Sequence, residues 1–301
     1  MEFSIIIATY ERVDSLERLL SSISRHFGQS QIEHEVIVAN NSRNSEVDKR
    51  IDAIVCRFQQ DHGDRFRSVR EPSPGKCRAQ NRAIHAAKGK ILVFFDDDIE
   101  VTPNWLPVAW EFFRDGTFDA MQGSILVPPE MANDQNFLRA QSKFRTISFV
   151  NYRRKMTELK TLTGGNMAIR SEVFARVGLF NEDLGPGRSG ISEDVEFAQR
   201  LLKSGGRIGY NSEAAVYHEV DWSRLTEEFF RRRHEQQGRS RLLYKNQSLA
   251  SILPNLVRTV WTLGWYSLMG NERKKYRSKG RYFHYRAMLA EKTRRITGSQ
   301  A

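Results

Sequence analysis

Short apolar runs alternate with segments of helical spacing through the first hundred residues. Strands are predicted from the apolar runs at 3–8, 35–39, 66–69 and 91–95. Helices are predicted where apolar residues recur every three or four positions, at 14–26, 48–60 and 76–87. Asp14 is the expected N-cap of the first helix. Strands that alternate with helices predict an α/β fold with a doubly wound, mainly parallel sheet.

The pattern is less regular after residue 100. Further helices are predicted at 105–114, 172–177 and 193–204, and further strands at 120–127, 167–169, 207–210 and 214–218. The polar segment 130–160 is expected to be irregular, as a flap. From residue 224 the chain is helical and basic. We therefore expect two domains, a sheet domain at 1–221 and a basic helical extension at 222–301.

The basic residues are concentrated in the last quarter of the chain. The net charge is +11 overall. Residues 1–221 carry 29 Lys and Arg against 31 Asp and Glu (−2), and residues 222–301 carry 18 against 5 (+13). Such an asymmetry predicts an anionic partner for the extension, whether a membrane surface, a nucleic acid or a diphosphate-linked substrate.

The cysteine content indicates a reducing compartment, and the hydropathy indicates no membrane-spanning segment. Cys56 and Cys77 are the chain's two cysteines, which is too few for a disulfide scaffold, and no CxxC suggests zinc. We expect no signal peptide, because no basic region followed by an apolar stretch opens the chain. The longest nearly apolar stretch, 251–270, contains Pro254 and Arg258, and its uncharged part is too short to span a bilayer.

Three adjacent carboxylates follow the apolar run 91–95. A strand buried on both faces cannot hold Asp96, Asp97 and Asp98, so they are expected at its C-terminal end, where open α/β sheets bind ligands. Neighbouring carboxylates repel one another, and a hard cation such as Mg²⁺ or Mn²⁺ relieves that repulsion. The run favours metal-assisted chemistry on a phosphate-bearing substrate, with a solvated acidic turn or a helix N-cap as the alternative.

Six fragments, in their order and spacing, resemble the family 2 glycosyltransferases. The resemblance covers about residues 1–220 and rests on the fragments 5–12, 35–42, 74–81, 95–98, 163–166 and 193–194. It implies a nucleotide-sugar-binding GT-A fold, a Rossmann-like mixed, mainly parallel sheet flanked by helices.

The resemblance implies a nucleotide-sugar site along one sheet edge. The family uses the turn after the first strand to hold the nucleoside, here Thr9, Tyr10 and Arg12. Asn40 stands where the family often has an Asp that accepts from uracil, and an amide could serve uracil, thymine or guanine. The start of the helix at 76 suits a diphosphate or base carbonyls, through Lys76, Arg78 and Asn81.

The acidic run and three later fragments would complete that site. Asp96 or Asp97 is expected at the ribose or sugar. Asp98 and His218 are the expected ligands of a Mn²⁺ or Mg²⁺ ion, with a structural histidine as the alternative for His218. The sugar and acceptor pocket would be lined by Gly164, Gly165 and Asn166. The expected catalytic base is Asp194, with Glu193 positioning it or the acceptor.

We therefore expect an inverting, metal-dependent hexosyltransferase that serves surface polysaccharide assembly. The expected donor is a nucleotide-diphosphate sugar, with a UDP-sugar as the first choice. The expected acceptor is a glycan or a lipid-linked sugar. Processive members carry Gln-x-x-Arg-Trp, whereas 236–240 reads Gln-Gln-Gly-Arg-Ser, so transfer of a single sugar is expected. We expect a cytoplasmic protein, with peripheral binding to the anionic inner face of the plasma membrane through aromatic residues interleaved in the basic extension.

Three other classes of protein would share part of this pattern. A nucleotidyltransferase would need a glycine-rich loop after the first strand, and 9–12 contains no glycine. A nucleic-acid-binding protein would use the basic extension but leave the aspartate run unexplained, so no nucleic acid is expected. Intact Asp98 and Asp194 argue against a non-catalytic sugar-binding module.

Overall fold

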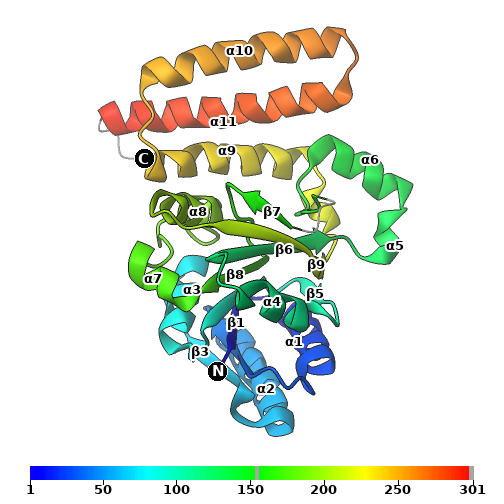
Figure 1. Ribbon diagram of the computed structural model, residues 1–301. Helices are drawn as coiled ribbons and strands as arrows, with labels where there is room; N and C mark the ends of the chain where they lie inside the picture. The colour runs from blue at the N-terminus through cyan, green and yellow to red at the C-terminus, as the bar shows by residue number, and fades with distance from the viewer. Residues whose placement is uncertain (153–155, 298–301) are drawn as a thin grey trace. The chain divides into compact units, whose positions relative to one another are not determined.

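The computed structural model describes residues 1–152 and 156–297, which form two compact units (Figure 1). Unit 1 comprises Met1–Pro128, Phe149–Glu182 and Glu193–Glu219. Unit 2 comprises Pro129–Ser148, Asp183–Ser192 and Val220–Ala301. Unit 2 thus includes two segments that precede the expected domain boundary at 221/222, and that boundary stays a prediction.

Unit 1 is built on a nine-stranded sheet in the order β3-β2-β1-β4-β8-β6-β9-β5, with β7 paired to β9. Its strands are β1 Phe3–Thr9, β2 His34–Asn40, β3 Phe66–Arg70, β4 Ile91–Asp96, β5 Ile99–Val101, β6 Ala120–Leu126, β7 Met156–Leu159, β8 Asn166–Arg170 and β9 Ile208–His218. Its helices are α1 Val13–Phe27, α2 Ser45–His62, the 3₁₀ turn η1 Gly63–Arg65, α3 Lys76–Ala86, α4 Trp105–Arg114, α7 Ser171–Val177 and α8 Glu193–Lys203.

Four parallel strands bring their carboxyl ends to one edge. In β1, Ile6 pairs with Ile37 of β2 and with Phe94 of β4, and all three strands run in the same direction. Thr9 therefore lies beside Asn40, and Ala8 beside Asp96. Beyond β4 the sheet becomes mixed, because β8 is antiparallel to both β4 and β6.

Alternate strand residues face two separate helical layers. Ile5 and Ile7 of β1 pack in a core with residues of α1, α2 and α4. Ile6, between them, packs in a second core with residues of α3, α7 and α8. This alternation follows from the two-residue repeat of a strand, and it explains why the central strands are apolar throughout. Unit 1 is a three-layer α/β/α arrangement.

Unit 2 is helical. Its helices are α5 Pro129–Ala132, α6 Gln135–Phe144, the 3₁₀ turn η2 Trp222–Arg224, α9 Glu227–Tyr244, α10 Leu249–Leu268 and α11 Glu272–Thr297. Figure 1 shows α9, α10 and α11 side by side, with α11 in the middle. The rings of Phe144, Phe230 and Tyr276 pack together with centroids 5.6–6.0 Å apart. This aromatic cluster joins α6 to α9 and α11.

The expected fold class is confirmed, with the helical extension present, while three local predictions are wrong and one strand was missed. Asp14 does not cap α1, which starts at Val13; its exposed carboxylate instead pairs with Arg50 at 3.3 Å. The segment 130–160 is not irregular, because α5, α6 and β7 lie in it. The strands expected at 207–210 and 214–218 are one, β9. The short strand β5 was not predicted.

Within the described ranges, no helix combines the length and the apolar content that crossing a bilayer requires.

Candidate active site

Two aspartates after β4 share one arginine. Thr9 donates its hydroxyl to Asp97 Oδ2 at 2.8 Å, and Arg12 Nη1 lies 3.2 Å from Asp97 Oδ1. Arg12 also forms an ion pair with Asp98 Oδ2. Burial raises the pKa of Asp97 to about 6, although Arg12 opposes that shift. The turn after β1 therefore holds the acidic run in place.

Asp96, Asp98 and His218 offer three ligand atoms within 4.8 Å of one another. The β5–β9 pairing places Ile99 opposite His218, and Glu219 donates its backbone N–H to the Asp98 carbonyl at 2.9 Å. His218 Nδ1 lies 2.7 Å from the Glu219 carbonyl, so Nδ1 is assigned the proton and Nε2 the lone pair. Nε2 lies 3.5 Å from Asp98 Oδ1. Two carboxylates and a neutral imidazole suit Mn²⁺, and the carboxylates suit Mg²⁺.

Lys76 links this group to a second pair of carboxylates. Its Nζ lies 2.5 Å from Asp96 Oδ1 and 3.4 Å from Glu193 Oε1. Burial alone would lower the pKa of Lys76, but Asp96 and Glu193 outweigh burial and the pKa is raised. Lys76 is therefore charged, and it lowers the repulsion between the two acidic groups.

Glu193 and Asp194 begin helix α8 beside the Gly164–Gly165 turn. Asp194 Oδ2 accepts from the Gly164 N–H at 2.7 Å, and its Oδ1 accepts from the Val195 N–H at 2.8 Å. A Cβ added to Gly164 would lie 3.7 Å from Asp194 Oδ2, and Gly165 has a φ of 97°. Burial raises the pKa of both carboxyl groups. A carboxylate with a raised pKa is a stronger base than a solvated one.

The model of the family described as "Glycosyl transferase family 2" matches residues 4–178, more than half of the chain. The chain belongs to this family.

Solved structures of similar fold include a mannosyltransferase and two structures of TarS. PcManGT, a mannosyltransferase from Pyrobaculum calidifontis solved with GDP-Man and Mn²⁺, aligns at a TM-score of 0.61 with 17% identity over 99% of this chain and 88% of its own. TarS of S. aureus aligns at 0.56 with 18% identity over 89% of this chain, which spans 44% of TarS. Residues 1–349 of TarS align at 0.55 with 16% identity, over 99% of this chain and 92% of theirs. No curated protein sequence matches the chain.

Of the residues expected from resemblance to glycosyl transferase family 2, most of those with charged side chains meet at this edge. The contacts described above join eight of these side chains: Asp96, Asp97, Asp98, Lys76, Arg12, Glu193, Asp194 and His218. Thr9, Gly164 and Gly165 lie beside them. Tyr10 is exposed on the turn after β1. Arg78 lies apart from the acidic run, with its Nε 3.4 Å from Glu182.

Three expected asparagines use their amides inside unit 1. Asn40 donates to Asp48 at 2.7 Å, and Asn81 donates to the Phe180 carbonyl at 3.0 Å. Asn166 is fully buried: it accepts from Trp105 Nε1 at 2.9 Å and donates to the carbonyls of Ser124 and Ala214. These contacts position neighbouring segments, and the ligand roles of these side chains stay predictions.

Sequence reasoning missed two features of the family 2 site. Asp96 was expected at the sugar, and the structure puts it in the possible metal group with Asp98; the i, i+2 spacing was the available signal. Lys76 was expected at a diphosphate or base carbonyls, and its contacts here are with Asp96 and Glu193. The contact with Glu193, 117 positions later, has no signal in one sequence.

Proposed function

We propose that the chain is an inverting, metal-dependent glycosyltransferase that moves one sugar from a nucleotide-diphosphate sugar to an acceptor hydroxyl in surface glycan assembly. One observation carries the proposal. A possible metal group, Asp96, Asp98 and His218, and a buried carboxylate pair, Glu193 and Asp194, lie on either side of one lysine. Sugar transfer needs this combination, a cation for the leaving diphosphate and a base for the attacking oxygen.

The buried carboxylates would act on the acceptor. Asp194 takes the hydroxyl proton as the acceptor oxygen bonds to the anomeric carbon, and the bond to the diphosphate oxygen breaks on the opposite face. Glu193 orients the acceptor or Asp194. The divalent ion, when bound, supplies Lewis-acid stabilisation of the departing nucleoside diphosphate. Gly164 and Gly165 leave room for the sugar, since neither has a side chain between the two acidic groups.

The base of the donor nucleotide is the open part of the proposal. A UDP-sugar was the first expectation, and PcManGT, of similar fold, was solved with GDP-Man. A thermal-shift panel of UDP, GDP, dTDP and CDP, each with Mn²⁺ or with EDTA, separates these cases. A ligand that binds the folded state alone raises its stability. We expect one nucleotide to stabilise the protein in Mn²⁺ and not in EDTA.

Two variants test the assigned roles. Asp98→Asn should lose the Mn²⁺-dependent shift, because it removes one carboxylate charge from the metal group. Asp194→Asn should keep that shift but lose transfer by about 100-fold or more, the range for a general base. The anomeric configuration of the product tests inversion. Full transfer activity in Asp194→Asn, or retention of configuration, would refute the mechanism.

The acceptor is proposed to lie at an anionic membrane surface, with the protein bound peripherally on the cytoplasmic side. Helix α10 exposes Val257, Trp261 and Leu268, which are 67–82% exposed, and the neighbouring α11 is basic. Exposed tryptophan beside basic residues suits a bilayer surface. Co-sedimentation with phosphatidylserine vesicles should fall in Trp261→Ser. Unchanged binding, or none in the unmodified protein, would remove the membrane from the proposal.

A further inference from the structure

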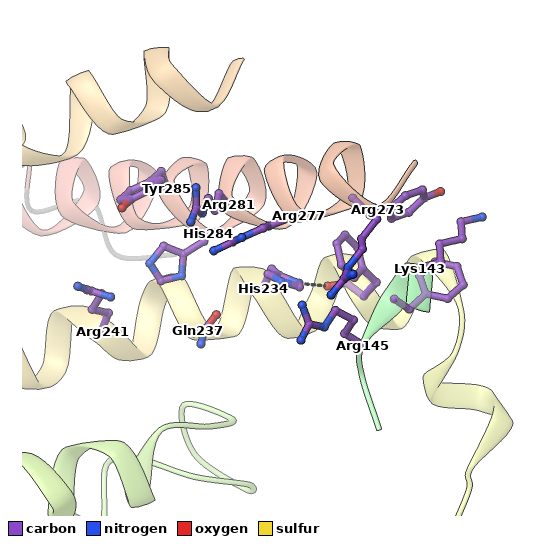
Figure 2. A pocket seen from close by; sticks show the side chains of 13 residues that line it. Lys143, Arg145, His234, Gln237, Arg241, Arg273, Arg277, Arg281, His284 and Tyr285 are labelled. Carbon is purple, nitrogen blue, oxygen red and sulfur yellow. Dashed lines mark hydrogen bonds between the residues drawn. The ribbon is translucent and has the colours of Figure 1, made fainter. Parts of the chain in front are cut away.

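Unit 2 contains a strongly cationic pocket of its own. It has a volume of about 400 Å³ and is bounded by the end of α6, by α9 and by α11 (Figure 2). Phe144, Phe230 and Tyr276 form its apolar end. Its basic lining side chains are Lys143, Arg145, Arg241, Arg273, Arg277 and Arg281. Among the described residues no Asp or Glu lines it, so the formal charge of this wall is +6.

The arginines of this pocket differ from other basic residues of the same helices. Arg286 pairs with Glu235 at 2.5 Å, Lys279 pairs with Glu227, and Arg294 pairs with Glu291 at 2.9 Å. Among the described residues, no carboxylate forms an ion pair with any pocket arginine. Glu227, Glu235 and Glu291 therefore pair with cations outside the pocket, and among the described residues none of them pairs with a pocket arginine.

A buried imidazole points into the same pocket. His284 is 8% exposed, and Figure 2 shows its ring projecting from α11 towards α9. Within the described residues, its Nδ1 has no hydrogen-bond partner. Burial, with smaller contributions from nearby Arg241 and His234, lowers the pKa of His284 to about 4. The ring is therefore neutral at neutral pH, and a neutral imidazole places no carboxylate-like charge against the arginines of the pocket.

The helices keep this arrangement although it costs stability. Arg273, Arg277 and Arg281 follow one another at i, i+4 on α11, and like-charged pairs at that spacing destabilise a helix. The close approach of the helices depends on Gly238, where a Cβ would lie 2.2 Å from the His284 carbonyl oxygen. A bound anion would relieve the repulsion between the arginines.

We propose that this pocket binds a compact group bearing two or more phosphates, such as a diphosphate. Arginine suits phosphate because its planar fork donates two parallel hydrogen bonds. A single phosphate carries a charge of about −1.5 to −2 and would leave most of the +6 wall uncompensated. The pocket is bounded on three sides by helices, which favours a compact group over an extended polymer. The inference goes beyond the proposed sugar transfer and does not depend on it.

The test is calorimetric titration of the full chain with inorganic pyrophosphate in EDTA, which excludes metal-bridged binding. Arg277→Gln with Arg281→Gln should weaken binding by about tenfold or more, because two charge-assisted contacts are lost. The matched control, Arg231→Gln with Arg239→Gln, removes the same charge from α9 outside the pocket and should change binding by less than about twofold.

Two results would overturn the proposal: no pyrophosphate binding, or equal weakening in both double variants. Thermal melts of each variant identify any that fail to fold. Arg277 and Arg281 are both exposed, so we expect the Arg277→Gln, Arg281→Gln variant to fold.

Vesicle flotation distinguishes the source of the phosphate. Phosphatidylcholine vesicles with a prenyl diphosphate are compared with phosphatidylserine vesicles of equal charge. Stronger retention on the former than on phosphatidylserine, displaced by pyrophosphate and lost in the Arg277→Gln, Arg281→Gln variant, supports a lipid diphosphate headgroup. Pyrophosphate binding without such retention supports a soluble diphosphate.

Discussion

Replacing Lys76 with methionine would leave Asp96 and Glu193 without their shared cation. The side chains of Lys76 and Glu193 are 15% and 8% exposed. Removing one partner from a buried ion pair costs about 3–5 kcal/mol, because the other charge stays buried without compensation. Asp96 is 26% exposed, so water screens part of its charge. We therefore expect Lys76→Met to lower the free energy of unfolding by about 3 kcal/mol, the lower end of that range.

The loss should depend on pH. Burial raises the pKa of Glu193 and of Asp194, and removing Lys76 raises both further. A carboxyl group whose folded pKa is raised contributes stability that is fully present below its unfolded pKa of about 4 and is lost as pH rises through the folded pKa. Lys76→Met should therefore be closest to the unmodified protein near about pH 4 and most destabilised above about pH 7.

The assay is urea unfolding in EDTA. Amide hydrogen exchange of β4 is the probe, because β4 belongs to unit 1. Lys88→Met is the matched control, because Lys88 is exposed and its replacement should change stability by less than about 0.5 kcal/mol. A loss below about 1 kcal/mol for Lys76→Met, or a loss that is independent of pH, would refute the argument that Lys76 compensates these carboxylates.

Three further changes test the packing. Glu35→Gln should cost about 1.5–3 kcal/mol at neutral pH. Hydrogen bonds from Ser4 and Lys88 outweigh burial and hold the pKa of Glu35 low, so the cost should vanish as pH falls through that lowered pKa, measured by urea unfolding across pH. Trp105→Phe removes the bond to Asn166 and should cost about 1–3 kcal/mol in the same assay. Gly238→Ala should lower the melting temperature of unit 2, while Gly264→Ala, with nothing within 4 Å of its Cβ, should not.

The fold of unit 1 was largely predictable because its central strands are buried on both faces. An apolar run such as 91–95 is stable only as a strand in the interior of the sheet. Its alternation with helices then predicts that the strands are parallel. The predictions failed where local sequence is ambiguous. Strand β5 has three residues, and β9 spans Asn211, Ser212 and Glu213, which read as a break between two strands. Its pairing with β6, which shifts register after Gly123, keeps it continuous.

The site was predictable only in its local fragments. Asp96, Asp97 and Asp98 follow a buried strand, so their place at the sheet edge could be inferred. The partners of Asp98 could not, because His218 reaches it through the β5–β9 pairing, 120 positions along the chain. In the sequence, Asn40 and Asn166 could be ligand-binding residues. The sequence does not reveal that their amides form hydrogen bonds within the protein, to Asp48 and to the Ala214 carbonyl.

The net charge of the site links its two halves. Five carboxylates, Asp96, Asp97, Asp98, Glu193 and Asp194, meet two cations, Arg12 and Lys76, which leaves a charge of −3 when every acid is ionised. A diphosphate would be repelled by such a site. A divalent ion at Asp96, Asp98 and His218 would reduce the charge to −1, so each of metal and donor should strengthen binding of the other by the same factor. The same added charge would make ionisation of Asp194 less costly. In the proposed mechanism, binding of the metal ion with the donor would therefore favour the ionised form of Asp194, which is the form that can accept the acceptor's proton.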